Sequence, residues 1–282
     1  MKLVKTASEL EQLLGQERIG KNVGFLPTMG ALHEGHLTLA RRAVKENDIT
    51  VVSVFVNPTQ FNNKTDLETY PRNVEADARA LEAAGVDFVF APVAEEFYTR
   101  EEMEQRFEFD FGGLDQVMEG KFRPGHFNGV VQVVSKLFRI VKPQRAYFGE
   151  KDFQQLAIIR RMVEVMGFDI EIVGCPIVRE ESGLALSSRN ALLTPDERVL
   201  ATNIHAVLKE STLFYDQTSV KELHDCAIAA INRHEGLEVE YFDIVDGRTL
   251  QSIDNWRDHD YVVGCITVYC GKVRLIDNIR YK

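Results

Sequence analysis

The chain has 282 residues, 45% of them hydrophobic and 27% charged, a balance typical of a globular protein rather than a disordered one. Its formal net charge of −10 argues against a surface that coats nucleic acid, so nucleic acid is not an expected partner. The four cysteines form no metal-binding pattern, and neither a signal peptide nor an apolar run of ~20 residues occurs, so we expect a cytoplasmic protein with no membrane partner.

Strand patterns alternate with helix patterns through the first two thirds of the chain. Runs of apolar, largely β-branched or aromatic residues predict strands at residues 23–26, 49–56, 86–92, 145–149 and 169–176. Helical periodicity predicts helices at residues 35–47, 73–85, 126–142 and 152–167. This alternation predicts an α/β fold with a Rossmann-like, doubly wound parallel sheet, whose ligands bind beyond the carboxyl ends of the strands.

The pattern changes after Pro176. A Thr-Pro-Asp-Glu sequence predicts a helix that begins after Thr194, and a second helix is expected over residues 220–233. Strand-like runs then occur at residues 238–246, 261–270 and 272–278. Helices followed by strands are typical of a small α+β domain, so we predict two domains, 1–176 and 177–282.

Two histidines follow the first predicted strand, in the segment "PTMGALHEGH". His33 and His36 lie where the strand gives way to a helix, and the unpaired N–H groups at the start of a helix bind anions. Gly30 and Gly35 allow a ligand to approach the backbone closely. One alternative is a surface turn, and another is a metal site, although the zinc-protease pattern H-E-x-x-H needs a spacing of four. We favour a phosphate-binding loop.

Two further polar loops follow predicted strands. Asn57 and Gln60 come after the second strand, and Pro58 bends the chain there, so we expect both amides in the crevice. Lys151 and Asp152 follow a later strand and suit a phosphate and a ribose hydroxyl, respectively. The alternatives are a surface lysine and an aspartate that only caps the next helix.

The last polar loop, "GLALSSRN", lies at the domain change and contains Ser187, Ser188 and Arg189. Hydroxyl groups beside a guanidinium suit a polyphosphate. As an alternative, either serine could simply cap a helix.

The motifs "LPTMGALHEGH", "NPTQF", "YPR", "GHFNGV", "FGEKDFQQ" and "GLALSSRN" together resemble, in order and spacing, those of the pantothenate synthetases, or pantoate–β-alanine ligases. This family belongs to the HxGH nucleotidyltransferase superfamily, in which the HxGH motif and a KMSKS-like loop hold ATP. The resemblance covers roughly residues 23–190, and the last third of the chain matches in length and general pattern only.

The resemblance implies a ligase that condenses (R)-pantoate with β-alanine through a pantoyl adenylate, while ATP is split to AMP and pyrophosphate. It implies that His36 is the proton-donating catalytic residue, with His33 and Lys151 beside the phosphates. Gln60 and Gln155 match the pantoate-binding residues of the family. The residues implied in ATP binding are Met29, Gly30, Ala31, Leu32, His33, Glu34, Gly35, His36, Gly149, Glu150, Lys151, Asp152, Val178, Leu186, Ser187, Ser188 and Arg189.

Further expectations concern partners and domains. The resemblance implies Mg²⁺ held mainly by the ATP phosphates rather than by protein ligands, and a homodimer. Residues 1–176 are expected to bind ATP and pantoate, and residues 177–282 to act as a lid that excludes water from the adenylate. Asp77 is expected to support the site indirectly.

Two other functions are weighed against this one. Another HxGH enzyme would adenylylate a phosphate-bearing acceptor and would need a basic pocket, whereas two glutamine-bearing loops suit a hydroxy acid. A regulatory module that binds nucleotide without turnover would lose only its affinity for the nucleotide when His36 is replaced. An enzyme would lose reaction rate.

Overall fold

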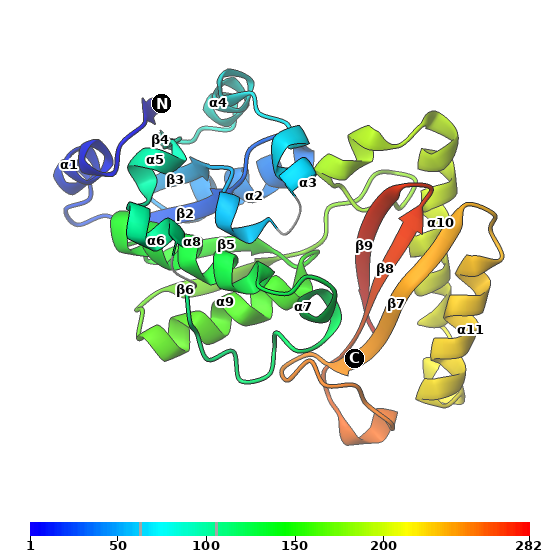
Figure 1. Ribbon diagram of the computed structural model, residues 1–282. Coiled ribbons are helices and arrows are strands. Elements are labelled where there is room, and N and C mark those ends of the chain that lie inside the picture. Colours follow the sequence, from blue (N-terminus) through cyan, green and yellow to red (C-terminus); the bar gives the residue numbers. More distant parts are fainter. Residues whose placement is uncertain (62–63, 105–106) are drawn as a thin grey trace. The chain divides into compact units, whose positions relative to one another are not determined.

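The computed structural model describes residues 1–61, 64–104 and 107–282 (Figure 1). This part of the chain forms two compact units. The first consists of Met1–Asp115, Gly120–Glu150 and Gln155–Cys175, and the second of Gln116–Glu119, Lys151–Gln154 and Pro176–Lys282. Two short segments from the first part of the chain thus belong to the second unit. The roles expected for residues 1–176 and 177–282 stay predictions.

Within the described residues, the first unit contains a six-stranded parallel sheet in the order β1-β4-β3-β2-β5-β6. Its strands are β1 (Lys2–Val4), β2 (Val23–Thr28), β3 (Ile49–Val54), β4 (Phe88–Phe90), β5 (Arg145–Gly149) and β6 (Glu171–Cys175). The chain order reverses at β2, which pairs with β3 on one side and with β5 on the other. Ligands of doubly wound sheets bind outside the carboxyl ends of strands at such a reversal.

Helices cover both faces of this sheet. Leu26 of β2 shares a buried cluster with Leu39 of α2 (Glu34–Glu46) and Leu81 of α4 (Val74–Ala83). Phe25 points to the opposite face, where its ring lies 6.2 Å from that of Phe138 of α8 (His126–Val141). All residues of β3 and all but Pro27 of β2 are buried, so both strands are covered on both faces, as their sequences predicted. The Rossmann-like doubly wound sheet is confirmed.

The other helices of the first 175 residues connect or flank these elements. They are α1 (Ala7–Glu17), η1 (Pro58–Gln60), α3 (Lys64–Thr69), α5 (Ala94–Phe97), α6 (Arg100–Glu104), α7 (Met118–Phe122) and α9 (Phe153–Met166). The edge strand β1 and helix α1 were not predicted from the sequence. In the described parts of the chain, no helix combines the length and the apolar character needed to cross a bilayer.

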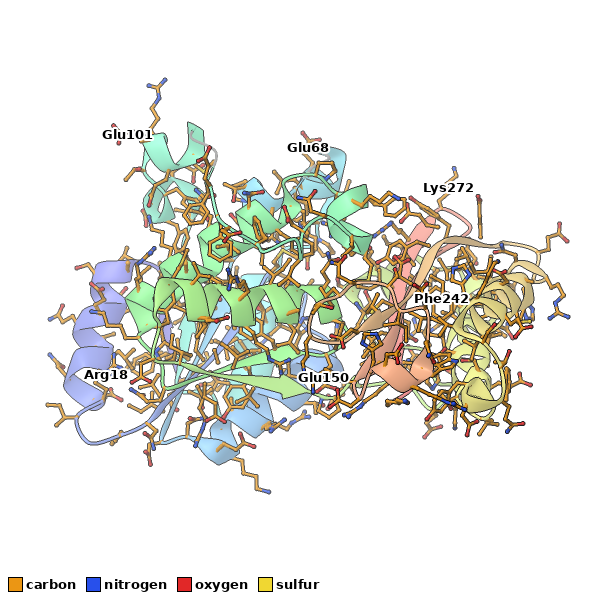
Figure 2. The ribbon with its side chains drawn as sticks, turned by 90° about the horizontal axis from the view of Figure 1, so that it is seen from below. Arg18, Glu68, Glu101, Glu150, Phe242 and Lys272 are labelled. Atoms are coloured by element: carbon orange, nitrogen blue, oxygen red, sulfur yellow. The ribbon has the colours of Figure 1, made fainter. Side chains whose placement is uncertain are left out.

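Among its described residues the second unit combines an antiparallel sheet with the α-helices α10 and α11 and three short 3₁₀ helices, which confirms the smaller α+β domain. Within the described residues its strands are β7 (Leu237–Asp246), β8 (Val262–Cys270) and β9 (Val273–Arg280), in that order. Its helices are η2 (Ser188–Leu192), α10 (Pro195–Ser211), η3 (Tyr215–Gln217), α11 (Val220–Asn232) and η4 (Trp256–Asp258). Thr194 and Glu197 form the capping box that the Thr-Pro-Asp-Glu sequence predicted. Phe242 of β7 is one of the core residues of this unit (Figure 2).

Candidate active site

The two histidines are held by the start of helix α2. His33 is the N-cap residue, and its Nδ1 accepts a hydrogen bond from the backbone N–H of Gly35 at 3.2 Å. The backbone N–H of His33 in turn donates to Nδ1 of His36 at 3.4 Å. The two rings lie with their centroids 4.1 Å apart. Because each Nδ1 accepts a hydrogen bond, the proton of each neutral imidazole is on Nε2, which is therefore a donor.

A buried carboxylate holds the backbone of the loop between β2 and α2. Oδ2 of Asp77 accepts the N–H of Ala31 at 3.0 Å, and Oδ1 accepts the N–H of Leu32 at 2.9 Å. Gly30 has a φ of +81°, and a Cβ on it would lie 2.8 Å from Oδ2 of Asp77. Ala31 also has a positive φ of 52°. The tight conformation of this loop thus depends on the glycine and on the carboxylate from α4.

Both amide side chains that the structure describes in the loop after β3 are buried, Asn57 completely and Gln60 with 8% exposure. Asn57 is fully buried, so the expectation that its side chain faces the crevice is wrong. Its Nδ2 donates to Oε1 of Gln60 at 3.1 Å and to the carbonyl of Gly129 at 3.0 Å, and its Oδ1 accepts the hydroxyl of Tyr98 at 2.9 Å. Burial raises the pKa of Tyr98, which keeps this hydroxyl a donor.

Gln60 is placed by contacts on two sides. Its Oε1 is taken by Asn57, which turns its Nε2 toward Sδ of Met29, 2.8 Å away. Its backbone carbonyl lies 2.8 Å from Nδ1 of His126 at the start of α8. A Cβ on Gly129 would lie 2.4 Å from the carbonyl of Thr59, so only glycine lets α8 approach this loop.

The remaining predicted site residues of the first unit lie at the end of β5 or after it. Gly149 ends this strand, and the backbone N–H of Glu150 donates to the carbonyl of Cys175 at 2.8 Å. Gln155 lies in the first turn of α9 and is half-buried, whereas its neighbour Gln154 is buried and belongs to the second unit.

The other predicted site residues lie in the second unit. Nζ of Lys151 is 3.8 Å from a carboxylate oxygen of Asp152. The carbonyl of Val178 accepts the N–H of Leu186 at 3.0 Å. Oγ of Ser187 accepts the N–H of Arg189 at 3.2 Å and so caps η2, as the alternative for this loop proposed. Capping leaves open a second role for this serine in ligand binding.

Comparison with known proteins identifies the family. A sequence model described as pantoate-beta-alanine ligase matches residues 2–280 of the chain. The chain belongs to the pantoate-beta-alanine ligase family. It is 59% identical over 283 residues to a pantothenate synthetase of Bacteroides fragilis strain YCH46, covering 100% of this chain and 99% of the relative. It is 60% identical over 284 residues to that of Phocaeicola vulgatus strain ATCC 8482, covering 100% of both.

Solved structures of this ligase family have the same fold. The crystal structure of pantothenate synthetase from Thermus thermophilus matches with a TM-score of 0.92 at 44% identity, covering 100% of this chain and 99% of that one. The ligase from Francisella tularensis, complexed with beta-gamma ATP and beta-alanine, matches with a TM-score of 0.82 at 35% identity, covering 100% and 98%. The protein is thus an enzyme, a ligase, as the sequence motifs predicted.

The structure of this ligase separates the predicted site residues into two groups. Met29 to His36, Gln60, Gly149, Glu150 and Gln155 lie in the first unit, and Lys151, Asp152, Val178 and Leu186 to Arg189 lie in the second. Within the first group, the histidine loop contacts the glutamine loop through Met29 and Gln60. The convergence of both groups on one triphosphate stays a prediction. Among the residues that the structure describes, no three His, Cys, Asp or Glu side chains could hold a metal ion.

Sequence reasoning missed several supporting residues of this ligase. The buried role of Asn57 had no sequence signal, because an amide in a loop looks the same whether it faces inward or outward. Asp77 was expected to give indirect support, but nothing in the pattern of α4 shows which backbone groups it holds. Asn278, whose Nδ2 donates to the carbonyl of Lys151 at 3.0 Å, lies 127 positions away in the sequence.

Proposed function

We propose that this ligase condenses (R)-pantoate with β-alanine to give pantothenate, AMP and pyrophosphate. The observation that carries this function is the family match over residues 2–280, with the histidine pair lying directly after β2, where the strand order reverses. In the first step, a carboxylate oxygen of pantoate bonds to the α-phosphorus of ATP, and the bond to the bridging oxygen of pyrophosphate breaks. In the second, the amine of β-alanine bonds to the acyl carbon, loses a proton and displaces AMP.

The histidine pair is proposed to stabilise the leaving pyrophosphate. Negative charge grows on the bridging oxygen as the bond to the α-phosphorus breaks, and donors fixed there stabilise the transition state more than the bound substrate. Nδ1 of His33 and Nδ1 of His36 are both engaged by backbone N–H groups, so each neutral ring carries its proton on Nε2. His36 is proposed as the proton donor, and the amino terminus of α2 adds a favourable potential.

The two glutamines are proposed to bind pantoate. Since Asn57 donates to Oε1 of Gln60, the amide orientation of Gln60 is fixed. Its Nε2–H₂ has two hydrogens, one of which faces Sδ of Met29, and the other is proposed to meet a substrate oxygen. A neutral amide holds hydroxyl and carboxylate oxygens without neutralising the nucleophile, as an arginine would. Gln155 in the first turn of α9 is proposed as the second contact.

ATP is proposed to bind through the remaining site residues as its Mg²⁺ complex, with the metal held by phosphate oxygens and water. Lys151 and the loop Ser187–Arg189 would meet the phosphates, Asp152 the ribose, and the backbone of Val178 the adenine. Residues 177–282 would act as the lid that keeps water from the adenylate. A homodimer and a cytoplasmic location complete the proposal.

The reaction can be tested with purified protein, ATP and Mg²⁺. We expect pyrophosphate release to require pantoate, and AMP and pantothenate to appear only after β-alanine is added. Pyrophosphate release with a phosphate-bearing acceptor in place of pantoate would instead indicate the other kind of HxGH enzyme.

His36→Ala distinguishes the enzyme from a nucleotide sensor. The variant should lose about 10²-fold or more of the rate of pyrophosphate release. It should still unfold in one cooperative transition, at a slightly lower temperature, because the cap that His36 gives to the N–H of His33 is lost. His234→Ala is the control, because His234 lies just after α11, outside the proposed site. A wild type that binds ATP but releases no pyrophosphate under any of these conditions would contradict the proposed function.

A further inference from the structure

Two short segments from the first part of the chain belong to the second unit. Gln116–Glu119 and Lys151–Gln154 are flanked on both sides by segments of the first unit. Lys151, the proposed phosphate-binding lysine, comes two residues after β5 ends at Gly149, yet it is not part of the unit that contains β5. Specific contacts within the second unit must therefore hold Lys151.

The side chain of Asn278 makes such a contact. Asn278 lies on β9 and is 8% exposed, and its Nδ2 donates to the backbone carbonyl of Lys151 at 3.0 Å. The neighbouring residues are held as well. The ring of Phe153 packs edge-on against that of Tyr261, and Nε2 of Gln154 donates to the carbonyl of Val117 at 2.8 Å.

The segment that contains Val117 is itself fixed to the antiparallel sheet. The buried carboxylate of Glu119 accepts two hydrogen bonds from Arg274 of β9, at 2.8 and 2.6 Å. It also accepts the hydroxyls of Tyr241 on β7 and Thr267 on β8, at 2.9 and 3.1 Å. Both inserted segments are thus attached to the same sheet through buried polar groups, which bind firmly because no water competes for them.

The same stretch of β9 also holds the hairpin of residues 179–185. This hairpin leads to Ser187–Arg189, here called the serine–arginine loop. Asp277, next to Asn278, receives two hydrogen bonds from the guanidinium of Arg179, at 2.7 and 2.8 Å. Arg179 also donates to the carbonyl of Asn278 at 3.3 Å and to that of Gly183 at 3.2 Å. It follows Val178 directly and pairs with Ala185 in an antiparallel bridge.

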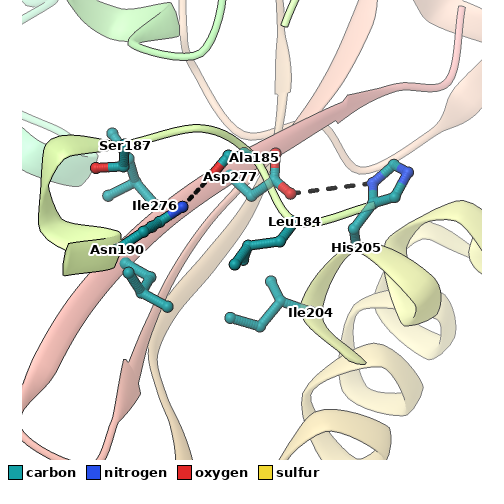
Figure 3. Close-up of a pocket in the computed structure, with 9 residues that line it drawn as sticks. Leu184, Ala185, Ser187, Asn190, Ile204, His205, Ile276 and Asp277 are labelled. Carbon is teal, nitrogen blue, oxygen red and sulfur yellow. Dashed lines mark hydrogen bonds and ion pairs between the residues drawn. The ribbon is translucent and has the colours of Figure 1, made fainter. Parts of the chain in front are cut away.

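The hairpin packs closely against β9 and α10. A cavity of about 10 Å³ lies between the hairpin, α10 and β9, and it is lined by Ser187, Asn190, His205 and Asp277 among others (Figure 3). Such a volume holds one water at most. The Nδ2 of Asn190 donates to the carbonyl of Ala185 at 3.0 Å, which fixes the base of the serine–arginine loop. The loop therefore cannot shift far relative to β9 without breaking buried hydrogen bonds.

We propose that Asn278 is a positioning residue for Lys151, and that Asp277 and Asn278 together make Lys151 and Ser187–Arg189 one rigid phosphate-binding set that belongs to the C-terminal unit. This inference rests on the proposed function, because it assigns those residues to the phosphates of ATP. Any movement of the second unit then carries the ammonium group of Lys151, the serine hydroxyls and the guanidinium of Arg189 together. The set is built before ATP arrives, which lowers the entropic cost of binding and of the transition state.

The test uses Asn278→Asp, which keeps the size of the side chain but cannot donate to the carbonyl of Lys151. We expect kcat/KM for ATP in pyrophosphate release to fall about tenfold or more, while KM for pantoate stays within about twofold. In a Lys151→Ala background the same substitution should have little further effect, because its effect acts through Lys151. Equal losses in both backgrounds would overturn the proposal.

Asn203→Asp is the matched control. Asn203 lies on α10 of the same unit, and its Nδ2 also donates to a backbone carbonyl, that of Leu200, at 2.8 Å. This variant should keep the ATP parameters of the wild type, and a loss equal to that of Asn278→Asp would overturn the proposal. If the wild type itself releases no pyrophosphate with pantoate, the proposed function fails, whereas an active wild type with an unaffected Asn278→Asp variant overturns only this inference.

A second measurement needs no variant. In a crystal structure of the wild-type protein with a non-hydrolysable ATP analogue and Mg²⁺, we expect Nζ of Lys151 on a phosphate oxygen and Nδ2 of Asn278 still on the carbonyl of Lys151. A structure in which the analogue is bound and either contact is absent would overturn the inference, whatever the stability of the variants.

Discussion

The side-chain amide of Asn57 donates a hydrogen bond to Oε1 of Gln60 over 3.1 Å, and this single contact decides which end of the glutamine amide is offered to a ligand. Oxygen and nitrogen of an amide have the same shape, so only a partner of known polarity orients the group. Asn57 itself is oriented by the carbonyl of Gly129, which can only accept a hydrogen bond and therefore faces Nδ2.

We predict that Asn57→Ala weakens pantoate binding and stability together. It leaves the hydroxyl of Tyr98 and the carbonyl of Gly129 without their buried partner, so the free energy of unfolding should fall by about 2–3 kcal/mol. KM for pantoate should rise about tenfold, because Gln60 can rotate. Steady-state kinetics and urea unfolding measure the two effects.

Asn128→Ala is the control for this prediction. Asn128 lies on α8, next to Gly129, and its Nδ2 donates to the carbonyl of Phe107 rather than to a residue of the glutamine loop. Its KM for pantoate should match that of the wild type. A normal pantoate KM in Asn57→Ala would show that the orientation of Gln60 does not matter.

We predict that Gly30→Ala impairs adenylation. The new Cβ would lie 2.8 Å from Oδ2 of Asp77 and 3.0 Å from Cγ1 of Val54, at a φ of +81°. The loop must then shift away from the carboxylate that holds Ala31 and Leu32, so the histidines move with it. The rate of pyrophosphate release should fall about tenfold or more.

Gly15→Ala provides the matched comparison. Gly15 lies within α1, and a Cβ there meets no atom within 4 Å. The substitution should raise the free energy of unfolding by about 0.5–1 kcal/mol and leave the rate unchanged. An unimpaired Gly30→Ala variant would rule out the close packing of the histidine loop on Asp77.

We predict that Arg274→Met is far more destabilising than Arg248→Met, although both arginines make two hydrogen bonds to a carboxylate. Arg274 is 21% exposed, and its loss removes the guanidinium that pairs with the buried carboxylate of Glu119 and the partly buried one of Glu240. Its removal should cost about 3–5 kcal/mol of unfolding free energy. Arg248 and Asp260 are 62% and 78% exposed, so water screens that pair and its removal should change the stability far less. Denaturant titration of both variants measures the difference, and equal losses would contradict the buried network.

We predict that the stability contributed by His205 is lost in acid. Burial lowers the pKa of His205, and the charge of Arg179 lowers it further, although Asp277 and its negative charge oppose the shift. The unfolded chain therefore binds the proton at a higher pH than the folded protein does. As the pH falls through about 6.5, protonation favours the unfolded state, and the contribution declines until the folded pKa is passed.

The comparison of wild type with His205→Gln isolates this effect. Thermal melts between about pH 7.5 and pH 5 should show that the advantage of the wild type shrinks as the pH falls. Lys209 is the other charged group that acts on the ring, and it also favours the neutral form. An advantage that grows in acid would mean that Asp277 captures a protonated His205 instead.

Local patterns predicted most of the elements of this ligase. The buried strands β2 and β3, the helix that begins at the histidines, and the capped start of α10 follow from side-chain periodicity and from caps that span only a few residues. The family motifs then identified the reaction, because chemistry of this kind needs particular side chains at short, fixed spacings.

Contacts between distant residues were decided only by the tertiary structure. No pattern shows that Asn57 turns inward toward Gly129, or that Asp77 holds the loop between Gly30 and His33. Nor does any local signal assign Lys151 to the unit that contains Asn278, since these residues lie 127 positions apart. Periodicity records whether a side chain is buried, whereas the partner of a buried polar group depends on how separate segments pack together.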